Sequence, residues 1–213
     1  MLREIPVLYS FCRCPYAMRA RFALKYAQIT FYLREINLKN KPPQMLKISP
    51  KGTVPVLQLS SRIIDESLEI IKWALAQNDP DNILNKTQQE QNLANNLIQY
   101  NDNNFVKILH EYKYPDWHPQ VNFETTKINI FSHLENIENY LTQNKFLVSN
   151  NISIADIAIF PFIRQLARIN EEEFRSWPFK KIINWLDYFL AHPVYKASMK
   201  KYPLWQNGPG ELF

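Results

Sequence analysis

Glycine is scarce in this chain: only 3 of its 213 residues are Gly, whereas 14 are Pro. This scarcity argues against glycine-rich phosphate-binding loops and against the turn-dense all-β folds, and it favours helices. The other proportions are ordinary for a globular protein, with 46% hydrophobic and 21% charged residues, which excludes intrinsic disorder and collagen-like architectures. The length of 213 residues fits one large domain or two small ones.

A long apolar segment is also lacking. The longest candidate, residues 152–163, carries Ser153 and Asp156 and contains Pro161, whereas a membrane-spanning helix needs about 18 or more apolar residues. Near the N-terminus only residues 5–9 form an apolar stretch, which is too short for the apolar region of a secretory signal. We therefore expect no membrane partner and a cytoplasmic location.

Cysteine is limited to Cys12 and Cys14, which are too close in sequence to build a disulfide framework and are expected to be thiols in a reducing compartment. Zinc binding by this pair would need two more ligands with paired spacing. The histidines do not provide that spacing and all lie in the part of the chain predicted to be helical: His110, His118, His133 and His192. We expect no metal, and no G-x-S-x-G motif supports a hydrolase.

Positive charge is concentrated in the first third of the chain. Residues 1–78 contain 12 Lys and Arg against 5 Asp and Glu, whereas residues 79–213 contain 13 against 15. No run of five basic residues occurs, and no basic helix alternates with aromatic residues, so nucleic acid is not the expected partner. A small anionic ligand fits the asymmetry better.

The first 78 residues alternate between strand-like and helix-like patterns. Residues 5–9 are apolar and partly β-branched, and residues 30–36 are again strand-like. Residues 17–27 follow helical spacing, and residues 55–64 resemble a hairpin. With a short helix within 41–48 and another over 66–77, the order is βαβ, then α, then ββα. This order predicts an α/β domain over residues 1–78, with a small mixed sheet and helices on its faces.

Beyond residue 78 the strand patterns disappear. Turn-forming residues at 78–82 mark a linker, which we place at residues 79–86. The helical patterns that follow cover residues 87–112, 123–143, 153–169 and 179–191. We expect an all-α domain over residues 87–213, with an irregular tail from residue 202.

A complete helix-start signal lies at residue 153. Ser153 and Asp156 form a capping box, with Asp in place of the usual Glu, and Ile152 and Ile157 occupy the positions of a hydrophobic staple. We interpret these polar residues as structural, without a catalytic role.

Cys14 is the candidate nucleophile. It directly precedes Pro15, and Pro is favoured at the first position of a helix, so Cys14 is the predicted N-cap. The positive end of the helix, with Arg13 and Arg19 nearby, is expected to favour the thiolate. The alternative is an inert buried cysteine, which is the favoured interpretation of Cys12.

Four strings of residues, in this order, resemble the glutathione transferase family: Cys14-Pro15-Tyr16-Ala17 after a strand, Gly52-Thr53-Val54-Pro55-Val56-Leu57, Asp65-Glu66-Ser67 before a helix, and the capping motif at 153–156. Residues 37–42, and the cysteine itself, are most similar to the cysteine-type members, of which the omega class is best known. The resemblance covers the whole chain and implies a thioredoxin-like first domain followed by a helical bundle.

The resemblance also implies a glutathione site. In the family the proline matching Pro55 is cis, and the residue matching Val54 pairs its backbone with the cysteinyl part of glutathione. Lys41 matches a lysine that meets the glycyl carboxylate. Glu66 and Ser67 match the pair that holds the γ-glutamyl ammonium and carboxylate, unless both are simple helix-cap residues.

The matching cysteine implies disulfide exchange, in which Cys14 becomes glutathionylated and is then released by a second glutathione. Ala17 stands where dithiol glutaredoxins carry a resolving cysteine, which excludes a C-x-x-C cycle. The expected activities are thiol transfer, deglutathionylation or dehydroascorbate reduction. The alternatives are conventional conjugation to electrophiles, with Tyr9 or Ser10 as less favoured hydroxyl candidates, and a non-catalytic interaction protein of the same fold.

The resemblance further implies an acceptor site between the domains and a homodimer. Candidate acceptor residues are Tyr112, Tyr114, Trp117, Phe162 and Arg164. Aromatic residues at helical spacing belong to a core more often than to a pocket, and this applies most to Phe162.

Overall fold

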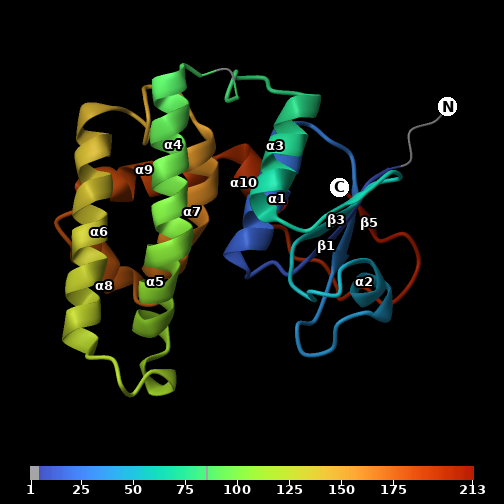
Figure 1. The fold of residues 1–213 in the computed structure, drawn as a ribbon, viewed down its shortest axis with the longest axis horizontal. Coiled ribbons are helices and arrows are strands. Elements are labelled where there is room, and N and C mark those ends of the chain that lie inside the picture. The colour runs from blue at the N-terminus through green and yellow to red at the C-terminus, as the bar shows by residue number, and fades with distance from the viewer. Residues whose placement is uncertain (1–4, 85) are drawn as a thin grey trace. The chain divides into compact units, whose positions relative to one another are not determined.

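The computed structural model describes residues 5–84 and 86–213, and these fall into two compact units (Figure 1). The first unit contains the residues up to Pro80 together with His192–Phe213, and the second contains Asp81–Ala191. The predicted linker, 79–86, includes residue 85, which lies outside the described residues.

A mixed five-stranded sheet forms the centre of the first unit, in the order β4-β3-β1-β2-β5. β1 pairs in parallel with β2 and antiparallel with β3, so that Leu8 lies opposite Leu33 on one side and Leu57 on the other. The predicted mixed sheet is therefore confirmed. Its strands are β1 (Val7–Ser10), β2 (Tyr32–Glu35), β3 (Val56–Gln58), β4 (Ile63–Ile64) and β5 (Glu211–Leu212).

Four helices accompany the sheet: α1 (Pro15–Tyr26), α2 (Pro43–Ile48), α3 (Ser67–Gln77) and α10 (Pro193–Ser198). α1 packs against α3 and against α10, and α1 and α3 lie side by side in Figure 1. Phe22 of α1 and Ile70 and Ile71 of α3 are fully buried. Burial of these apolar faces stabilises the layer of helices on the sheet.

The C-terminal segment differs from the prediction. We expected residues 87–213 in the helical domain and an irregular tail, whereas His192–Phe213 packs with the first unit and ends in β5. The Trp205 amide donates to the Glu35 carbonyl at 2.7 Å, and the Phe213 amide donates to the Phe31 carbonyl at 2.8 Å. A two-residue strand is too short to show a period in the sequence. It forms because the tail meets the free edge of β2.

The second unit is helical, as predicted. Its long elements agree with the predicted ranges, but a π-helical turn divides the predicted helix 87–112, and α8 was not predicted. The helices are α4 (Gln88–Tyr100), η1 (Asn101–Phe105, π), α5 (Val106–Lys113), η2 (Pro115–Trp117, 3-10), α6 (Phe123–Gln143), α7 (Ile154–Ala167), α8 (Glu171–Ser176) and α9 (Lys180–Ala191).

The predicted capping box at the start of α7 is present. The fully buried Asp156 carboxylate accepts hydrogen bonds from the Ser153 amide at 2.9 Å and from the Ser153 hydroxyl at 2.6 Å. It also accepts from the Leu147 amide at 3.0 Å and from Trp185 Nε1 at 2.9 Å. Asp156 therefore joins α7, α9 and the preceding loop, which supports its structural interpretation.

Among the described residues, no helix combines the length and the apolar character that crossing a membrane requires.

Candidate active site

Cys14 occupies the start of α1 in the predicted manner. It is the N-cap residue, with extended backbone angles (φ −79°, ψ 123°), and Pro15 follows at the first helical position. The Cys14 carbonyl accepts the first helical hydrogen bond from the Met18 amide at 2.9 Å. Because an N-cap side chain lies beside unpaired amides, the thiol faces the N–H groups of Tyr16 and Ala17.

The thiol also meets the loop before β3. Cys14 Sγ donates to the Val54 carbonyl at a distance of 3.8 Å, and the Val54–Pro55 peptide bond is cis. Cys14 packs against a cluster of buried residues that includes Val54 and Ala17. Two motifs 40 positions apart in sequence thus meet at the sulfur.

The acidity of Cys14 differs from the expectation. Burial raises the pKa of the Cys14 thiol above its ordinary value, whereas the amides of Ala17 and Tyr16 and the charge of Arg19 lower it to a smaller extent. The helix start and Arg19 therefore act in the predicted direction, but desolvation outweighs them. In this structure Cys14 is a thiol that donates to Val54.

Cys12 lies in a different environment. Its amide donates to Glu35 Oε1 at 2.7 Å, and Glu35 forms a buried ion pair with Arg21 at 3.3 Å. Burial and the negative charge of Glu35 raise the pKa of the Cys12 thiol. Both effects disfavour the thiolate of Cys12, and among the described residues no helix start stabilises it.

The alternative hydroxyls of β1 are both enclosed. Tyr9 is 1% exposed, and its hydroxyl accepts a hydrogen bond from Arg34, whose guanidinium also lies over the Trp205 ring at 4.3 Å. Ser10 is 0% exposed. Neither hydroxyl is accessible to a bound thiol, which agrees with the preference for Cys14.

The start of α3 brings together charged and polar groups. Glu66 is the N-cap residue, but its side chain makes no capping hydrogen bond, and its carboxylate instead forms an ion pair with Lys51. Ser67 is buried, and its hydroxyl accepts a hydrogen bond from Arg19 at 3.4 Å. Glu66 thus has the N-cap position expected of a helix-cap residue, but its side chain does not provide a capping hydrogen bond.

Lys41 lies next to the loop between α2 and β3. Gly52 has φ +65°, and a Cβ added there would lie 3.6 Å from Lys41 Nζ. Residues 51–55 therefore connect the predicted positions: Lys41 beside Gly52, Cys14 beside Val54, and Glu66 beside Lys51. The six residues predicted in this unit border one loop and two helix starts.

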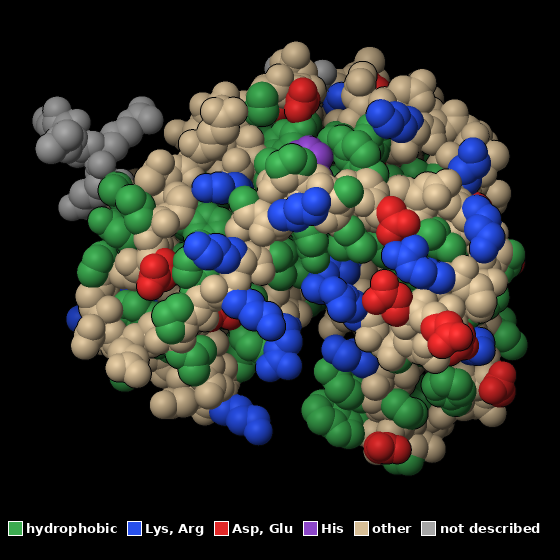
Figure 2. Space-filling view, turned by 180° about the vertical axis from the view of Figure 1, so that it is seen from behind, with side chains coloured by type: hydrophobic (Ala, Val, Ile, Leu, Met, Phe, Trp, Pro, Cys, Tyr) green, Lys and Arg blue, Asp and Glu red, His purple; other side chains and the backbone are tan. Residues whose placement is uncertain are grey.

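Basic side chains gather on one part of the molecular surface. On the face drawn in Figure 2, the left part carries several Lys and Arg side chains with few Asp and Glu between them. This agrees with the 12 to 5 excess of basic residues in positions 1–78. Such a surface attracts a small anion.

The candidate acceptor residues belong to the second unit, and they differ in how far their side chains are buried. Phe162 is 0% exposed and Tyr112 is 7% exposed and stacked on Phe123, so both are core residues. Tyr114 and Trp117 stack on each other with ring centroids 4.7 Å apart, and Trp117 is 69% exposed. Of these four aromatic residues, only Tyr114 and Trp117 are available for contacts at the surface.

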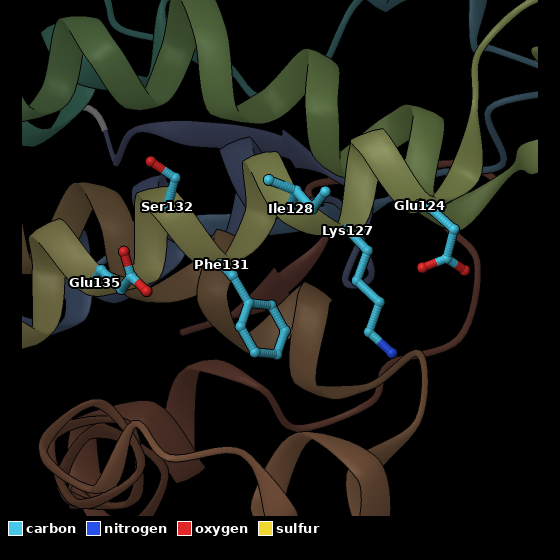
Figure 3. Close-up of a pocket in the computed structure, with 6 residues that line it drawn as sticks. All are labelled: Glu124, Lys127, Ile128, Phe131, Ser132 and Glu135. Atoms are coloured by element: carbon cyan, nitrogen blue, oxygen red, sulfur yellow. The ribbon is translucent and has the colours of Figure 1, made fainter.

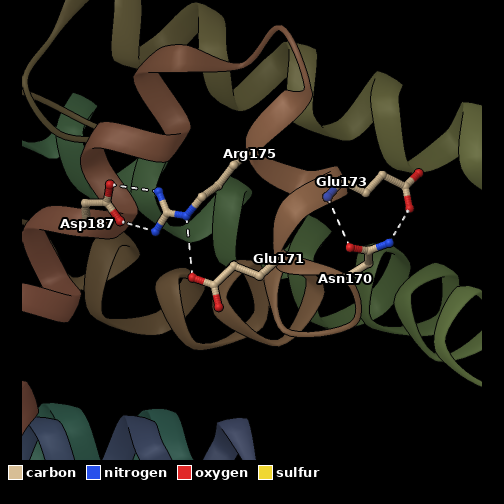
Figure 4. Close-up of polar contacts among 5 residues, drawn as sticks. All are labelled: Asn170, Glu171, Glu173, Arg175 and Asp187. Carbon is tan, nitrogen blue, oxygen red and sulfur yellow. Dashed lines mark hydrogen bonds and ion pairs between the residues drawn. The ribbon is translucent and has the colours of Figure 1, made fainter.

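Arg164 lines a small depression formed by α7, α8 and α9. Arg175 and Asp187 line the same depression and form two hydrogen bonds, at 3.1 and 2.9 Å, and Arg175 also contacts Glu171 at 3.4 Å (Figure 4). Because these charges neutralise one another, the depression has the character of a structural network.

A shallow groove on α6 is lined by none of the predicted residues. All its lining residues come from that one helix (Figure 3). Lys127 forms an ion pair with Glu173 at 2.8 Å. Neither cysteine lines the groove, whose lining residues are Glu124, Lys127, Ile128, Phe131, Ser132 and Glu135.

Sequence reasoning missed Lys51. The Gly52 amide donates to the Ser49 carbonyl at 3.0 Å, which closes a turn with Pro50 and Lys51 at its centre. The Ser49 hydroxyl donates to Asp65 Oδ2 at 2.8 Å and ties this turn to the residues before α3. The Ser-Pro-Lys-Gly string was a readable turn signal, but only the fold shows which helix start the turn reaches.

Within residues 5–84 and 86–213, no group of three or more His, Cys, Asp or Glu side chains is arranged to hold a metal ion.

Two family models cover most of the chain. The glutathione S-transferase N-terminal domain matches residues 8–82, and the glutathione S-transferase C-terminal domain matches residues 124–193. The chain belongs to the glutathione S-transferase family. The predicted family and fold are therefore confirmed, as is the expectation that the chain is a glutathione transferase enzyme.

The glutathione transferases with similar sequences come from several classes. The chain is 28% identical over 171 residues to glutathione S-transferase L1 of Arabidopsis thaliana, covering 79% of this chain and 69% of the relative. It is 26% identical over 210 residues to glutathione S-transferase omega-1 of Mus musculus, covering 94% and 84%. It is 24% identical to the probable chloroplastic glutathione S-transferase DHAR2 of Oryza sativa subsp. japonica, and the match spans 56% of that relative.

Solved glutathione transferases share the fold. A glutathione S-transferase-I structure bound with lactoylglutathione superposes with a TM-score of 0.77 at 20% identity, covering 92% of this chain and 99% of that one. At this identity the likeness concerns the fold.

Proposed function

We propose that this glutathione transferase is of the cysteine type and catalyses glutathione-dependent thiol transfer through Cys14, as in deglutathionylation or dehydroascorbate reduction. The observation that carries the proposal is the position of the Cys14 sulfur, at the start of α1 and in contact with the Val54 carbonyl. The enclosure of Tyr9 and Ser10 supports it further, because conjugation by a hydroxyl-type site needs an accessible hydroxyl.

The proposed exchange has two steps. The Cys14 thiolate attacks the glutathione sulfur of a mixed disulfide, the old S–S bond breaks, and the acceptor leaves as a thiolate that takes up a proton. A second glutathione thiolate then attacks the glutathione sulfur on Cys14, releasing oxidised glutathione and the Cys14 thiolate. No net oxidation of the protein occurs, because one glutathione thiol is oxidised to the disulfide while the acceptor sulfur is reduced to a thiol.

Glutathione fits the charges that border the site. It carries two carboxylates and one ammonium, and the proposed contacts are Lys41 with the glycyl carboxylate, Ser67 with the γ-glutamyl carboxylate and Glu66 with the ammonium. The Val54 backbone, next to Pro55, pairs with the cysteinyl part. These assignments rest on the resemblance and on the grouping of these residues around one loop.

Thiolate formation is linked to this binding mode. In the free protein the Cys14 thiol donates to Val54, a contact that favours the protonated form. Pairing of glutathione with the Val54 backbone competes for that carbonyl. The amides of Tyr16 and Ala17 and the charge of Arg19 then stabilise the thiolate without that opposition.

The decisive experiment is intact-mass measurement after incubation with oxidised glutathione at neutral pH. We expect one glutathione adduct on the wild type and on Cys12→Ser, none on Cys14→Ser, and complete discharge by reduced glutathione. An adduct that persists in Cys14→Ser would remove Cys14 from the chemistry and favour conjugation.

Retention on immobilised glutathione distinguishes the two enzymatic hypotheses, thiol transfer and conjugation, from a non-catalytic interaction protein of the same fold. We expect the wild type to be retained and eluted by free glutathione. Failure to bind would contradict the proposed function.

Location and assembly complete the proposal. A cytoplasmic location agrees with two free cysteines, and a homodimer is expected from the resemblance to the family. Size-exclusion chromatography with light scattering tests the dimer, and a mass of one chain would contradict it.

A further inference from the structure

Glu66 already holds a cation in the free protein. Lys51 Nζ forms an ion pair with Glu66 Oε1 and donates to the Asp65 carbonyl at 3.2 Å. The side chains of Lys51 and Glu66 are 41% and 68% exposed, so both remain open to a ligand. An exposed pair of this kind contributes little free energy and exchanges partners readily.

The position of Lys51 is imposed by the fold. Lys51 lies at the centre of the turn closed by Ser49 and Gly52, and the Ser49 hydroxyl anchors this turn to the Asp65 carboxylate at 2.8 Å. The anchor brings the lysine to the start of α3, where Glu66 is the residue before Ser67. Lys51 is therefore held next to Glu66 by backbone and side-chain contacts, and not by the ion pair alone.

This arrangement bears on how the site recognises an amine. In the proposed function, Glu66 receives the γ-glutamyl ammonium of glutathione. A carboxylate with an ammonium already beside it gains less from a ligand ammonium than a bare carboxylate does, because part of the attraction is already satisfied. The same carboxylate is also penalised less when a ligand without an amine covers it.

We propose that Lys51 is a specificity-determining residue that competes with the ligand ammonium for Glu66. The site thereby discriminates only weakly between γ-glutamyl thiols and thiol peptides whose α-amine is blocked or absent. This inference rests on the proposed function, since it assumes that glutathione binds with its ammonium at Glu66.

The test compares the affinities of S-methylglutathione and N-acetyl-S-methylglutathione by titration calorimetry. The thioether cannot form a disulfide with Cys14, so binding is measured apart from chemistry. We define the preference as the affinity for S-methylglutathione divided by that for N-acetyl-S-methylglutathione. In Lys51→Met we expect this ratio to be about three- to fivefold higher than in the wild type, because the surface ion pair that competes for Glu66 is lost. In Glu66→Gln we expect that preference to vanish.

Lys72→Met is the matched control. Lys72 also lies at α3, forms an exposed ion pair with Glu69 at 2.8 Å, and its loss changes the net charge equally. We expect Lys72→Met to show the same preference for the free amine as the wild type. Far-UV circular dichroism and thermal melts identify any variant that fails to fold, and Lys51→Gln repeats the test with a shorter neutral side chain.

Three results would overturn the inference. One is an unchanged preference in both Lys51 variants, another is weaker binding of S-methylglutathione by Lys51→Met than by Lys72→Met, and the third is wild-type discrimination in Glu66→Gln. Failure of the wild type to bind either S-methylglutathione or glutathione itself would instead refute the proposed function, and the inference with it.

Discussion

At the scale of single residues, Cys14 illustrates how opposing effects set the state of a nucleophile. The helix start, the amides of Tyr16 and Ala17 and the charge of Arg19 favour the thiolate, while burial against apolar neighbours favours the thiol. Burial is the largest effect, and the thiol hydrogen bond to Val54 has the same sign. The free enzyme therefore keeps its cysteine protonated.

The raised pKa of Cys14 predicts its alkylation behaviour. In Cys12→Ser without glutathione, we expect the rate of Cys14 alkylation by iodoacetamide to climb about tenfold per pH unit from pH 6 to 8.5, because the thiolate fraction grows without saturating. The measurement is a mass-spectrometric time course at each pH. A plateau below pH 8 would contradict the direction of the shift.

His133 is a second residue whose state is set by its surroundings. Its ring stacks with those of Tyr100 and Phe105, at centroid distances of 5.4 and 4.0 Å. Among the described residues its Nε2 atom has no hydrogen-bond partner. Burial lowers the pKa of His133 from 6.5 to about 4. The folded protein thus binds this proton less readily than the unfolded chain does.

The pKa of His133 predicts lower stability in acid. As the pH falls from about 7 to 4.5, the unfolded chain gains a proton at this position that the folded protein does not, which removes about 2 kcal/mol of the free energy of unfolding. Between pH 7 and 4.5 we expect the free energy of unfolding of His133→Phe to fall by about 2 kcal/mol less than that of the wild type, as measured by urea titration. Equal losses in the two proteins would show that His133 is not the group responsible.

At the scale of secondary-structure elements, two capping boxes differ in what surrounds them. The box of α4 joins Thr87 to Glu90 at the exposed surface, whereas Asp156 at the start of α7 is fully buried and also binds Leu147 and Trp185. The motif is the same in sequence, but only the second connects separate elements.

This difference predicts unequal effects of substitution. Asp156→Ala leaves several buried donors without an acceptor, so we expect it to lower the free energy of unfolding by about 3 to 5 kcal/mol. Thr87→Ala removes one exposed cap and should lower it by about 1 kcal/mol. Urea denaturation of both variants makes the comparison, and similar losses would contradict the connecting role of Asp156.

The elements also show how far periodicity can be read. Helix 123–143 was predicted with the same bounds as α6, because its apolar positions recur at helical spacing between clear boundaries. The π-turn at Asn101–Phe105 was not predicted, since π-turns are rare single-turn insertions within α-helices. The six-residue helices α8 and α10 were too short to show a period.

At the scale of the whole molecule, the chain returns to its first unit. Trp205 lies against the Tyr9 ring with a centroid distance of 5.9 Å and packs on the buried cluster that includes Val54 and borders Cys14. The Arg34 guanidinium lies over both rings and donates to the carbonyls of Gly208 and Pro209 at 3.1 Å each. The C-terminal segment is thus part of the scaffold of the candidate site.

The packing of this segment predicts where its loss is felt. We expect Trp205→Ala to lower the free energy of unfolding by about 2 kcal/mol and to speed hydrogen exchange in β1 and β2, but not in α6 or α7. The control is Trp117→Ala, which removes a 69% exposed ring and should change stability by less than about 0.5 kcal/mol. Faster exchange confined to the second unit would contradict this assignment.

The sequence by itself determined the local features: the helix that begins at Cys14-Pro15, the hairpin, the capping box at Ser153, and the family. These depend on neighbours within a few residues, where turn and capping preferences act directly. Only the tertiary structure decided the protonation of Cys14, the return of the tail to β2, and the meeting of Lys51 with Glu66. Burial and contacts between distant segments control these features, and neither is encoded in the spacing of residues along the chain.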